Sequence, residues 1–380
     1  MSRDAAAFSL RRLIAMMRKE FLQLGRDRGS IGMMIVMPIM QLLLFGYAIE
    51  TQPRHLPTVL LMGEQTSAGR AILGALQNTR YIDFKRVVAS PEELDHAILS
   101  GEALFAVEIP VGFERKLRRG ERPAILVVSD ATDPVASSSA IAAATGTVQT
   151  ALARERFIDT TDASASAPYE IRVHRRFNPS GETPLNIVPG LLGVILTMST
   201  LVFTALAVTR ETERGTMETL LAMPISPVEI MLGKIAPYVV VGFGQMAVVL
   251  VAGALAFKVP IIGSLTLLIA LSTLFLASNL SLGYLISTVT TNQLQALQLS
   301  FGVFMPNILL SGFMFPFAGM PKWAQAIGEA LPLTHYLRIV RGIMLKGAVM
   351  VDLRFDVLAM TAFMVAVMAL AVFRFRQTLD

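Results

Sequence analysis

The residues that could do chemistry in this chain are few, and none of them forms a familiar catalytic arrangement. The sequence contains no cysteine, which excludes disulfides, thiolate metal sites and cysteine nucleophiles. Histidines and carboxylates do not recur at metal-ligand spacing. Four scattered histidines are each expected at the surface or at an interface, and they are His55, His96, His174 and His335. The sequence therefore predicts no catalytic, cofactor or metal site.

A source of energy within the chain is also missing. A phosphate-binding loop needs glycines followed by Lys and Ser or Thr, because its backbone N–H groups cradle phosphates. The pair Gly233-Lys234 is followed by Ile235 and does not fit that pattern. The apolar runs carry no acidic residue, so the proton or sodium relay of a secondary transporter is absent. If the chain does work, a partner must supply it.

Charge does gather in one short segment, between two uncharged runs. The runs 185–209 and 235–257 have 25 and 23 residues, and neither contains Asp, Glu, Lys or Arg. About 20 apolar residues cross a hydrocarbon core of about 30 Å as a helix, so both runs predict membrane spans. The segment 210–238 between them would lie at one membrane face. It could dock into a cytoplasmic protein, or it could be a polar loop that keeps two helices apart.

Composition agrees with a membrane protein. Hydrophobic residues make up 53% of the chain and charged residues 16%, against about 25% charge in soluble domains. The net charge of +5 fits Lys and Arg at a cytoplasmic membrane edge better than nucleic-acid binding, because no basic cluster joins a nucleic-acid fold.

The elements that position these residues follow from hydropathy and periodicity. Residues 1–30 contain an amphipathic helix with a basic face, which suits the cytoplasmic headgroups or, alternatively, a soluble partner. Six uncharged or nearly uncharged runs predict spans at 31–49, 185–209, 235–257, 265–288, 294–314 and 357–373. Between the first two spans, residues 50–182 alternate β-branched strands with helical runs, which predicts a small α/β domain with a mostly covered sheet.

The predicted fold class is therefore an α-helical polytopic membrane protein with six transmembrane helices and an inserted extracytoplasmic α/β domain. Lys and Arg flank both ends of the chain, so both termini are expected in the cytoplasm. The segment 316–352 does not fit this topology well. It would lie on the extracytoplasmic side, and yet it carries basic residues and apolar runs. We expect it to be re-entrant or to lie at the interface.

Polar residues inside the spans have two interpretations. Most are expected to form hydrogen bonds between helices, which contribute about 0.6–2 kcal/mol each. Asn186 and Asn307 lie beside Pro189 and Pro306, where a helix can open. Those two residues, together with Gln41, are candidates for a substrate path.

Three separated motifs resemble the type-2 ABC transporter permeases, in particular the drug-exporter-like branch with a large external domain after the first span. The first is RETERGTMETLLAMPISPVEI, which begins at Arg210. The second is Leu-Ser-Gly-Phe, Met-Pro-x-Trp and Pro-Leu-Thr-His-Tyr in that order within 306–347. The third is RKEFLQLGRDR at 18–28. The resemblance covers the whole chain and the order of its predicted elements.

The resemblance implies the membrane half of an exporter in the bacterial inner membrane. A coupling helix at 210–226 would contact cytoplasmic ABC ATPase subunits, which would bind ATP and magnesium in place of this chain. Its residues would be Arg210, Glu211, Glu213, Arg214, Gly215, Thr216, Glu218, Leu221 and Pro224. The first helix, with Arg18, Lys19 and Glu20, would be a connecting helix beside that contact. Further partners would be a second permease subunit, identical or paralogous, membrane lipids, and a periplasmic adaptor.

Other functions remain open at this point. The chain could be a membrane sensor or an envelope-assembly scaffold that binds through its α/β domain. A membrane-embedded enzyme is disfavoured because a catalytic arrangement is missing. The cargo of an exporter could be drug-like, lipid, peptide or another hydrophobic compound.

Overall fold

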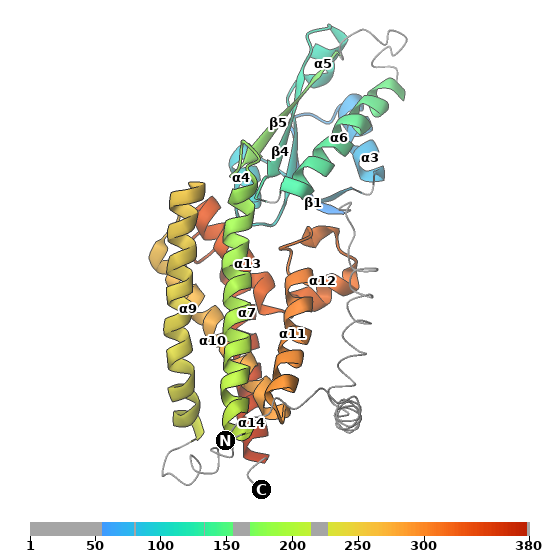
Figure 1. Cartoon of the computed structure of the whole chain (residues 1–380). Helices are drawn as coiled ribbons and strands as arrows, with labels where there is room; N and C mark the ends of the chain where they lie inside the picture. Colours follow the sequence, from blue (N-terminus) through green and yellow to red (C-terminus); the bar gives the residue numbers. More distant parts are fainter. Residues whose placement is uncertain (1–54, 80, 133, 155–167, 214–226, 378–380) are drawn as a thin grey trace, which may run out of the picture.

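The computed structural model describes residues 55–79, 81–132, 134–154, 168–213 and 227–377. It consists of an α/β region and a bundle of long helices that meet end to end (Figure 1). The predicted connecting helix, the first predicted span and the segment 214–226 lie outside the described residues.

A five-stranded sheet forms the centre of the α/β region, with strand order β2-β1-β3-β4-β5. Only β3 and β4 pair antiparallel, whereas the other three neighbouring pairs are parallel. The strands are β1 (Leu56–Met62), β2 (Ile82–Val88), β3 (Phe105–Ile109), β4 (Ala124–Asp130) and β5 (Glu170–Arg176). The Val, Ile and Leu residues of β1, β3 and β4 suit strands that are buried on both faces, whereas the edge strand β5 is mostly exposed.

Helices cover both faces of that sheet. On one face, α3 (Ser67–Asn78), α5 (Phe113–Arg118) and α6 (Pro134–Arg154) bury side chains such as Ile72 and Leu152. On the other face, α4 (Pro91–Leu99) packs Leu94 and Ile98 against β1 and β3. The alternation of strands and helices that we predicted for 50–182 is therefore present in the described part of that segment.

Local sequence signals set where these helices begin. Thr66 accepts a hydrogen bond from the Gly69 N–H and caps α3. Ser90 does the same for α4 through the Glu93 N–H, and Pro91 follows at the first helical position. Both caps satisfy N–H groups that a helix start leaves without an intrahelical partner.

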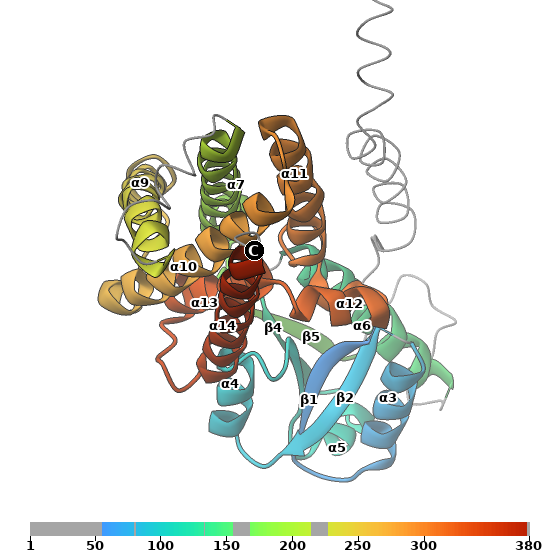
Figure 2. The ribbon, with the colours of Figure 1, turned by 90° about the horizontal axis from the view of Figure 1, so that it is seen from below.

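Four helices of the bundle are long and apolar enough to cross a membrane. They are α7 (Thr183–Glu213), α9 (Pro227–Phe257), α10 (Leu265–Val289) and α14 (Arg354–Gln377). A fifth helix, α11 (Gln293–Leu310), has 18 residues and occupies the predicted run 294–314, but it is not among those four. Helix α7 packs against α9, α10 and α11, and Figure 2 shows it between α9 and α11.

The segment 316–352, whose basic residues and apolar runs fitted neither a span nor an external loop, folds into short helices. These are the 3-10 turn η2 (Phe317–Gly319), α12 (Lys322–Glu329), α13 (Pro332–Arg341) and the π-helical turn η3 (Gly342–Lys346). Helix α13 packs against α7, α10 and α14, and its residues Leu333, Tyr336, Ile339 and Val340 are fully buried. Helix α13 and the turn η3 are thus part of the core of the bundle, at the end nearest the α/β region (Figure 1).

Candidate functional site

The last turn of α7 carries the described part of the predicted coupling segment. Arg210, Glu211 and Glu213 belong to α7 itself, and the other six predicted coupling residues lie outside the described residues. Arg210 and Glu213 are exposed. This charged turn is at the opposite end of α7 from the α/β region (Figure 1).

Gln293, the first residue of α11, fixes that turn. Its backbone N–H and its side-chain NH₂ both donate to Glu213 Oε2, at 3.3 and 2.8 Å, and Arg210 Nε donates to Gln293 Oε1 at 3.4 Å. The Glu213 carboxylate therefore lies at a helix N-terminus, where the helix dipole favours negative charge. One turn earlier, the buried Thr209 and Thr290 hydroxyls lie 3.1 Å apart. The end of α7 is thus tied to the α10–α11 turn.

A second site forms around the sequence Pro-Leu-Thr-His-Tyr at the start of α13. Pro332 occupies the first turn, where its missing N–H costs nothing. Thr334 Oγ1 donates to the Gly328 carbonyl at 2.6 Å, and His335 Nε2 lies 2.8 Å from the Glu329 carbonyl. These two side chains therefore satisfy carbonyl groups at the end of α12, which a helix terminus leaves without an intrahelical partner.

The next residue of the motif anchors α13 to α10. The Tyr336 ring stacks on Phe275 with centroids 3.9 Å apart, and its hydroxyl lies 2.7 Å from Ser272 Oγ. Gly193 of α7 permits this approach, because a Cβ there would come within 2.8 Å of Leu333 and 3.1 Å of Tyr336. The motif thus joins α7, α10, α12 and α13 at one point.

A charged cluster lies beside the motif, and it corrects one prediction. His335, which we expected at a surface or interface, is buried, with 7% of its side chain exposed. Its Nδ1 lies 2.8 Å from Asp356 Oδ1 of α14. Arg338 bonds Glu329 at 2.5 Å, lies 3.4 Å from Asp356 and covers the Phe317 ring at 4.8 Å. A histidine can be buried here because polar partners meet both ring nitrogens.

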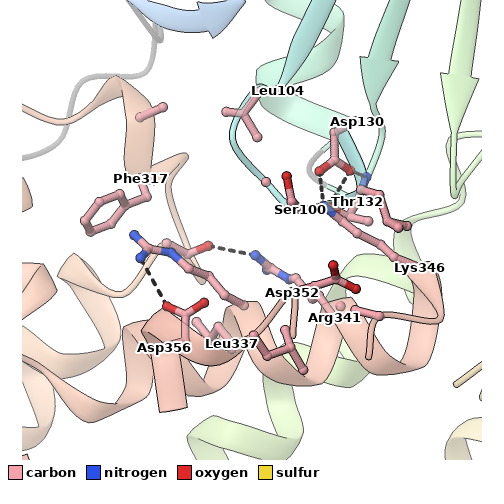
Figure 3. Close-up of a pocket in the computed structure, with 18 of the residues that line it drawn as sticks. Ser100, Leu104, Asp130, Thr132, Phe317, Leu337, Arg341, Lys346, Asp352 and Asp356 are labelled. Carbon is pink, nitrogen blue, oxygen red and sulfur yellow. Dashed lines mark hydrogen bonds and ion pairs between the residues drawn. The ribbon is translucent and has the colours of Figure 1, made fainter. Parts of the chain in front are cut away.

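Between the two regions of the molecule lies a cavity of about 420 Å³ (Figure 3). Its walls come from the α/β region on one side, including Leu104 and Asp130, and from α13 and the start of α14 on the other. The lining mixes apolar side chains with both signs of charge. The charged residues are Asp130, Arg338, Arg341, Lys346, Asp352 and Asp356. Arg341 Nη1 donates to the Gly312 carbonyl at 3.3 Å across this space.

One buried ion pair crosses between the two regions at the cavity wall. Lys346 Nζ lies 2.5 Å from Asp130 Oδ2, and the two side chains are 10% and 2% exposed. Asp130 also accepts from the Thr132 N–H and hydroxyl, and Lys346 lies over the Phe177 ring. Lys346 ends the π-helical turn η3, and Gly347 follows with φ +68°, a conformation that favours glycine.

The structure does not bring the two described substrate-path candidates together. Gln41 lies outside the described residues. Asn307 is fully buried, and neither of its side-chain polar atoms has a partner; the Asn186 side-chain oxygen is also without one among the described residues. Because Glu213 contacts Gln293, α7 and α11 run antiparallel. Counting about 1.5 Å per residue along both helices separates Asn186 and Asn307 by roughly 20 Å in depth.

Several residues of these sites were missed by sequence reasoning. Gln293, Asp130 and Asp356 carry no motif of their own, and Lys346 and Asp130 are 216 residues apart in the chain. Two signals in the sequence could have found them. Polar but uncharged residues, 290–293, separate two apolar runs and so mark a turn at a helix end. Basic residues inside the apolar stretch 338–346 indicate that buried acidic partners are needed.

Comparison with known proteins identifies the family. A model described as "ABC-2 family transporter protein" matches residues 28–373. The chain is 30% identical over 374 residues to "Probable multidrug ABC transporter permease YbhS" of Escherichia coli strain K12, a match that covers 98% of each protein.

Two further relatives agree. "Inner membrane transport permease YhhJ" of Escherichia coli strain K12 is 30% identical over 338 residues, which is 85% of this chain and 86% of that protein. "ABC transporter G family member 20" of Dictyostelium discoideum is 23% identical over 88% of this chain and 46% of its own length. Together with the family match over 28–373, these relatives show that the chain belongs to the ABC-2 family of transporter permeases.

Proposed function

We propose that this permease is the membrane-spanning subunit of an exporter that moves a drug-like, lipid or other hydrophobic compound out of the cytoplasm. A separate ATPase subunit that binds ATP and magnesium would supply the work by docking on the 210–226 loop. Family membership and the name of one relative, a probable multidrug permease, support this role. The sequence contains neither a phosphate-binding loop nor acidic residues in its apolar runs that could supply the energy within this chain.

The observation that carries the proposal is the placement of the two ends of α7. The helix has 31 residues and is about 46 Å long, enough to cross a hydrocarbon core of about 30 Å. The α/β region lies at its N-terminal end and the charged turn with Arg210 and Glu213 at its C-terminal end (Figure 1). If the charged turn faces the ATPase in the cytoplasm, the α/β region is extracytoplasmic.

The same orientation extends to the rest of the chain. Helices α7, α9, α10, α11 and α14 would be spans two to six, and residues 31–49 would be the first, which puts both termini in the cytoplasm of a bacterial inner membrane. The segment 316–352 would then sit at the outer face, beneath the α/β region. This arrangement explains why its cations pair with acids of the α/β region and of α14 instead of with lipid phosphates.

The cavity of about 420 Å³ suits an exit chamber for the cargo. Its lining offers apolar surface from Leu104, Phe317 and Leu353 beside charges of both signs, which fits an amphipathic compound better than a purely apolar one. Gln41, Asn186 and Asn307 would be polar stations of the path below. A second permease subunit, identical or paralogous, would complete the path, and the α/β region could hand cargo to a periplasmic adaptor.

The experiment that tests this function is a double substitution in the coupling segment. We expect Arg214→Ala with Glu218→Ala to leave the protein inserted and the α/β region folded. The ATPase activity of the subunit that co-purifies in mild detergent should fall at least tenfold, because the charged contacts are lost. Arg119→Ala with Glu121→Ala is the matched control, since it removes an exposed pair in the α/β region.

Two outcomes would contradict the proposal. Unchanged ATPase activity in the Arg214 and Glu218 double variant would remove the coupling role from this loop. Failure of any ATPase to co-purify with an inserted, folded chain would favour the membrane sensor or scaffold in its place.

A further inference from the structure

The hydrogen-bond partners of His335 determine which of its two ring nitrogens carry protons. One ring nitrogen, Nε2, lies 2.8 Å from the backbone carbonyl of Glu329, and the other, Nδ1, lies 2.8 Å from Asp356 Oδ1. A backbone carbonyl can only accept a hydrogen bond, so Nε2 must carry a proton. A carboxylate also only accepts, so Nδ1 must carry one as well. A neutral imidazole has a single N–H and satisfies only one of these contacts.

The additional proton could in principle sit on Asp356 instead of on the imidazole. Arg338 argues against that, because its Nη1 lies 3.4 Å from the same Asp356 oxygen and favours an ionised carboxylate. Glu329 adds negative charge, with its Oε2 at 3.8 Å from His335 Nε2. The proton therefore belongs on the imidazole.

The charges around His335 favour its cationic form. Those that face it are Glu329 from α12, Asp356 from α14 and Arg338 from its own helix α13. Helices α10 and α11 contain no Asp, Glu, Lys or Arg, and those of α7 lie in its last turn, at the far end of that helix. Burial lowers the pKa of His335, but the hydrogen bonds with Asp356 and the Glu329 carbonyl raise it by more, so it lies above the ordinary 6.5. Helix α13 is outside the four candidate spans.

We propose that His335 is a proton-binding site of this permease and carries its positive charge at neutral pH. The imidazolium joins three elements, since it holds the last carbonyl of α12, that of Glu329, and the first turn of α14 to α13. Asp356 and Arg338 also line the cavity, so this joint forms part of the cavity wall. Loss of the proton at alkaline pH removes one of the two hydrogen bonds and loosens α12 from α14. The proposal does not depend on the direction of transport.

The direct test is a titration of the histidine rings by NMR in the full chain. The protein contains only four histidines, so selective ¹⁵N labelling of the ring nitrogens gives four sets of signals. His55, His96 and His174 are exposed. Substituting each of these with Gln assigns the His335 signal by elimination, without altering the buried site. At pH 7.5 we expect attached protons on both ring nitrogens of His335.

A variant sharpens the test. Asp356→Asn keeps an acceptor beside Nδ1 but removes its charge, and should lower the proton affinity of His335 at least tenfold, seen as a lower titration midpoint. Hydrogen exchange at the α12 amides should rise with it at pH 7.5. The proposal is overturned if either ring nitrogen of His335 lacks its proton at pH 7.5, or if Asp356→Asn leaves the titration midpoint of His335 unchanged.

Discussion

The α/β region and the helix bundle expose opposite kinds of side chain. In the α/β region the large hydrophobic residues that are well exposed are few, and examples are Val87 and Val111. On α9 they form a face along the helix, where Val240 is 71% and Leu255 80% exposed. An apolar face of this kind suits lipid or another subunit and not water. One chain therefore contains two folds that are adapted to two solvents.

Charge is used differently in the two regions as well. In the α/β region, ion pairs such as Arg86–Glu102 and Arg176–Asp95 lie at the surface, and each contributes little in water. The pair Lys346–Asp130, between the α/β region and the bundle, and the pair His335–Asp356, within the bundle, are both buried. Charged side chains on the α/β region therefore mostly face solvent, whereas those of α13, η3 and α14 form buried ion pairs that hold elements together.

The largest expected effect comes from breaking the buried pair between the regions. Lys346→Met leaves the Asp130 carboxylate buried without its cation, which costs about 3–5 kcal/mol. We expect a lower thermal midpoint in detergent and faster hydrogen exchange at the end of β4. Adding Asp130→Asn should recover part of the loss, because no unpaired charge remains.

The matched control for that prediction is Arg119→Met, which breaks an exposed pair with Glu121 at 3.7 Å. It should cost less than about 1 kcal/mol. If Lys346→Met were as mild as Arg119→Met, charge would not act differently in the two regions.

A somewhat smaller effect is expected from filling a close contact between the backbones of two helices in the bundle. A Cβ on Gly283 of α10 would lie 2.7 Å from the Leu201 carbonyl of α7 and 2.9 Å from Thr204. Gly283→Val should therefore cost about 1–3 kcal/mol through overpacking. Gly244→Val on α9 is the control, since nothing lies within 4 Å there. Yields of monodisperse protein and thermal midpoints compare the two, and equal losses would refute the close packing of α7 on α10.

How much of this could be predicted from the sequence differs between the regions. The start of α4 can be predicted locally, because Ser90 caps the helix and Pro91 follows at its first position. The antiparallel pairing of β3 with β4 could not be predicted, since pairing depends on partners that are distant along the chain. The burial of α13 was also hidden, because Arg338 and Arg341 indicate a surface until their partners in space are known. The six-span count and the inserted domain stay predictions.

The candidate site was predicted unevenly for the same reason. The motif Pro-Leu-Thr-His-Tyr was visible in the sequence, but its packing role was not, because Ser272 and Gly193 come from other helices. Arg210 and Glu213 were singled out by their charge, whereas their partner Gln293 is neutral.

A hydrogen bond within the bundle gives a smaller test. Tyr336→Phe removes the hydroxyl that meets Ser272 at 2.7 Å and keeps the ring stacked on Phe275. We expect a loss of about 1 kcal/mol. A double-mutant cycle with Ser272→Ala should give a coupling energy of similar size. Additive losses would mean that the two hydroxyls do not interact.

The smallest expected effect is a loss of stability in the α/β region at acidic pH. The pKa of Glu114 is lowered to about 2, first by the hydrogen bond from the Ala68 N–H, and also by Arg118 and Ser67. Its contribution to stability is therefore present above pH 4.5 and is lost as the pH falls towards about 2. Hydrogen exchange at the start of α3 should increase over that window, and Glu114→Gln should abolish the pH dependence. An unchanged dependence in Glu114→Gln would assign it to another group.

The most direct test of the account is the side of the membrane on which each end of α7 lies. Because the chain has no cysteine, single substitutions Glu218→Cys and Glu121→Cys each create one unique label site. The account predicts that a membrane-impermeant maleimide labels Glu121→Cys in intact cells, and Glu218→Cys only after the inner membrane is permeabilised. Labelling of Glu218→Cys from outside would contradict it.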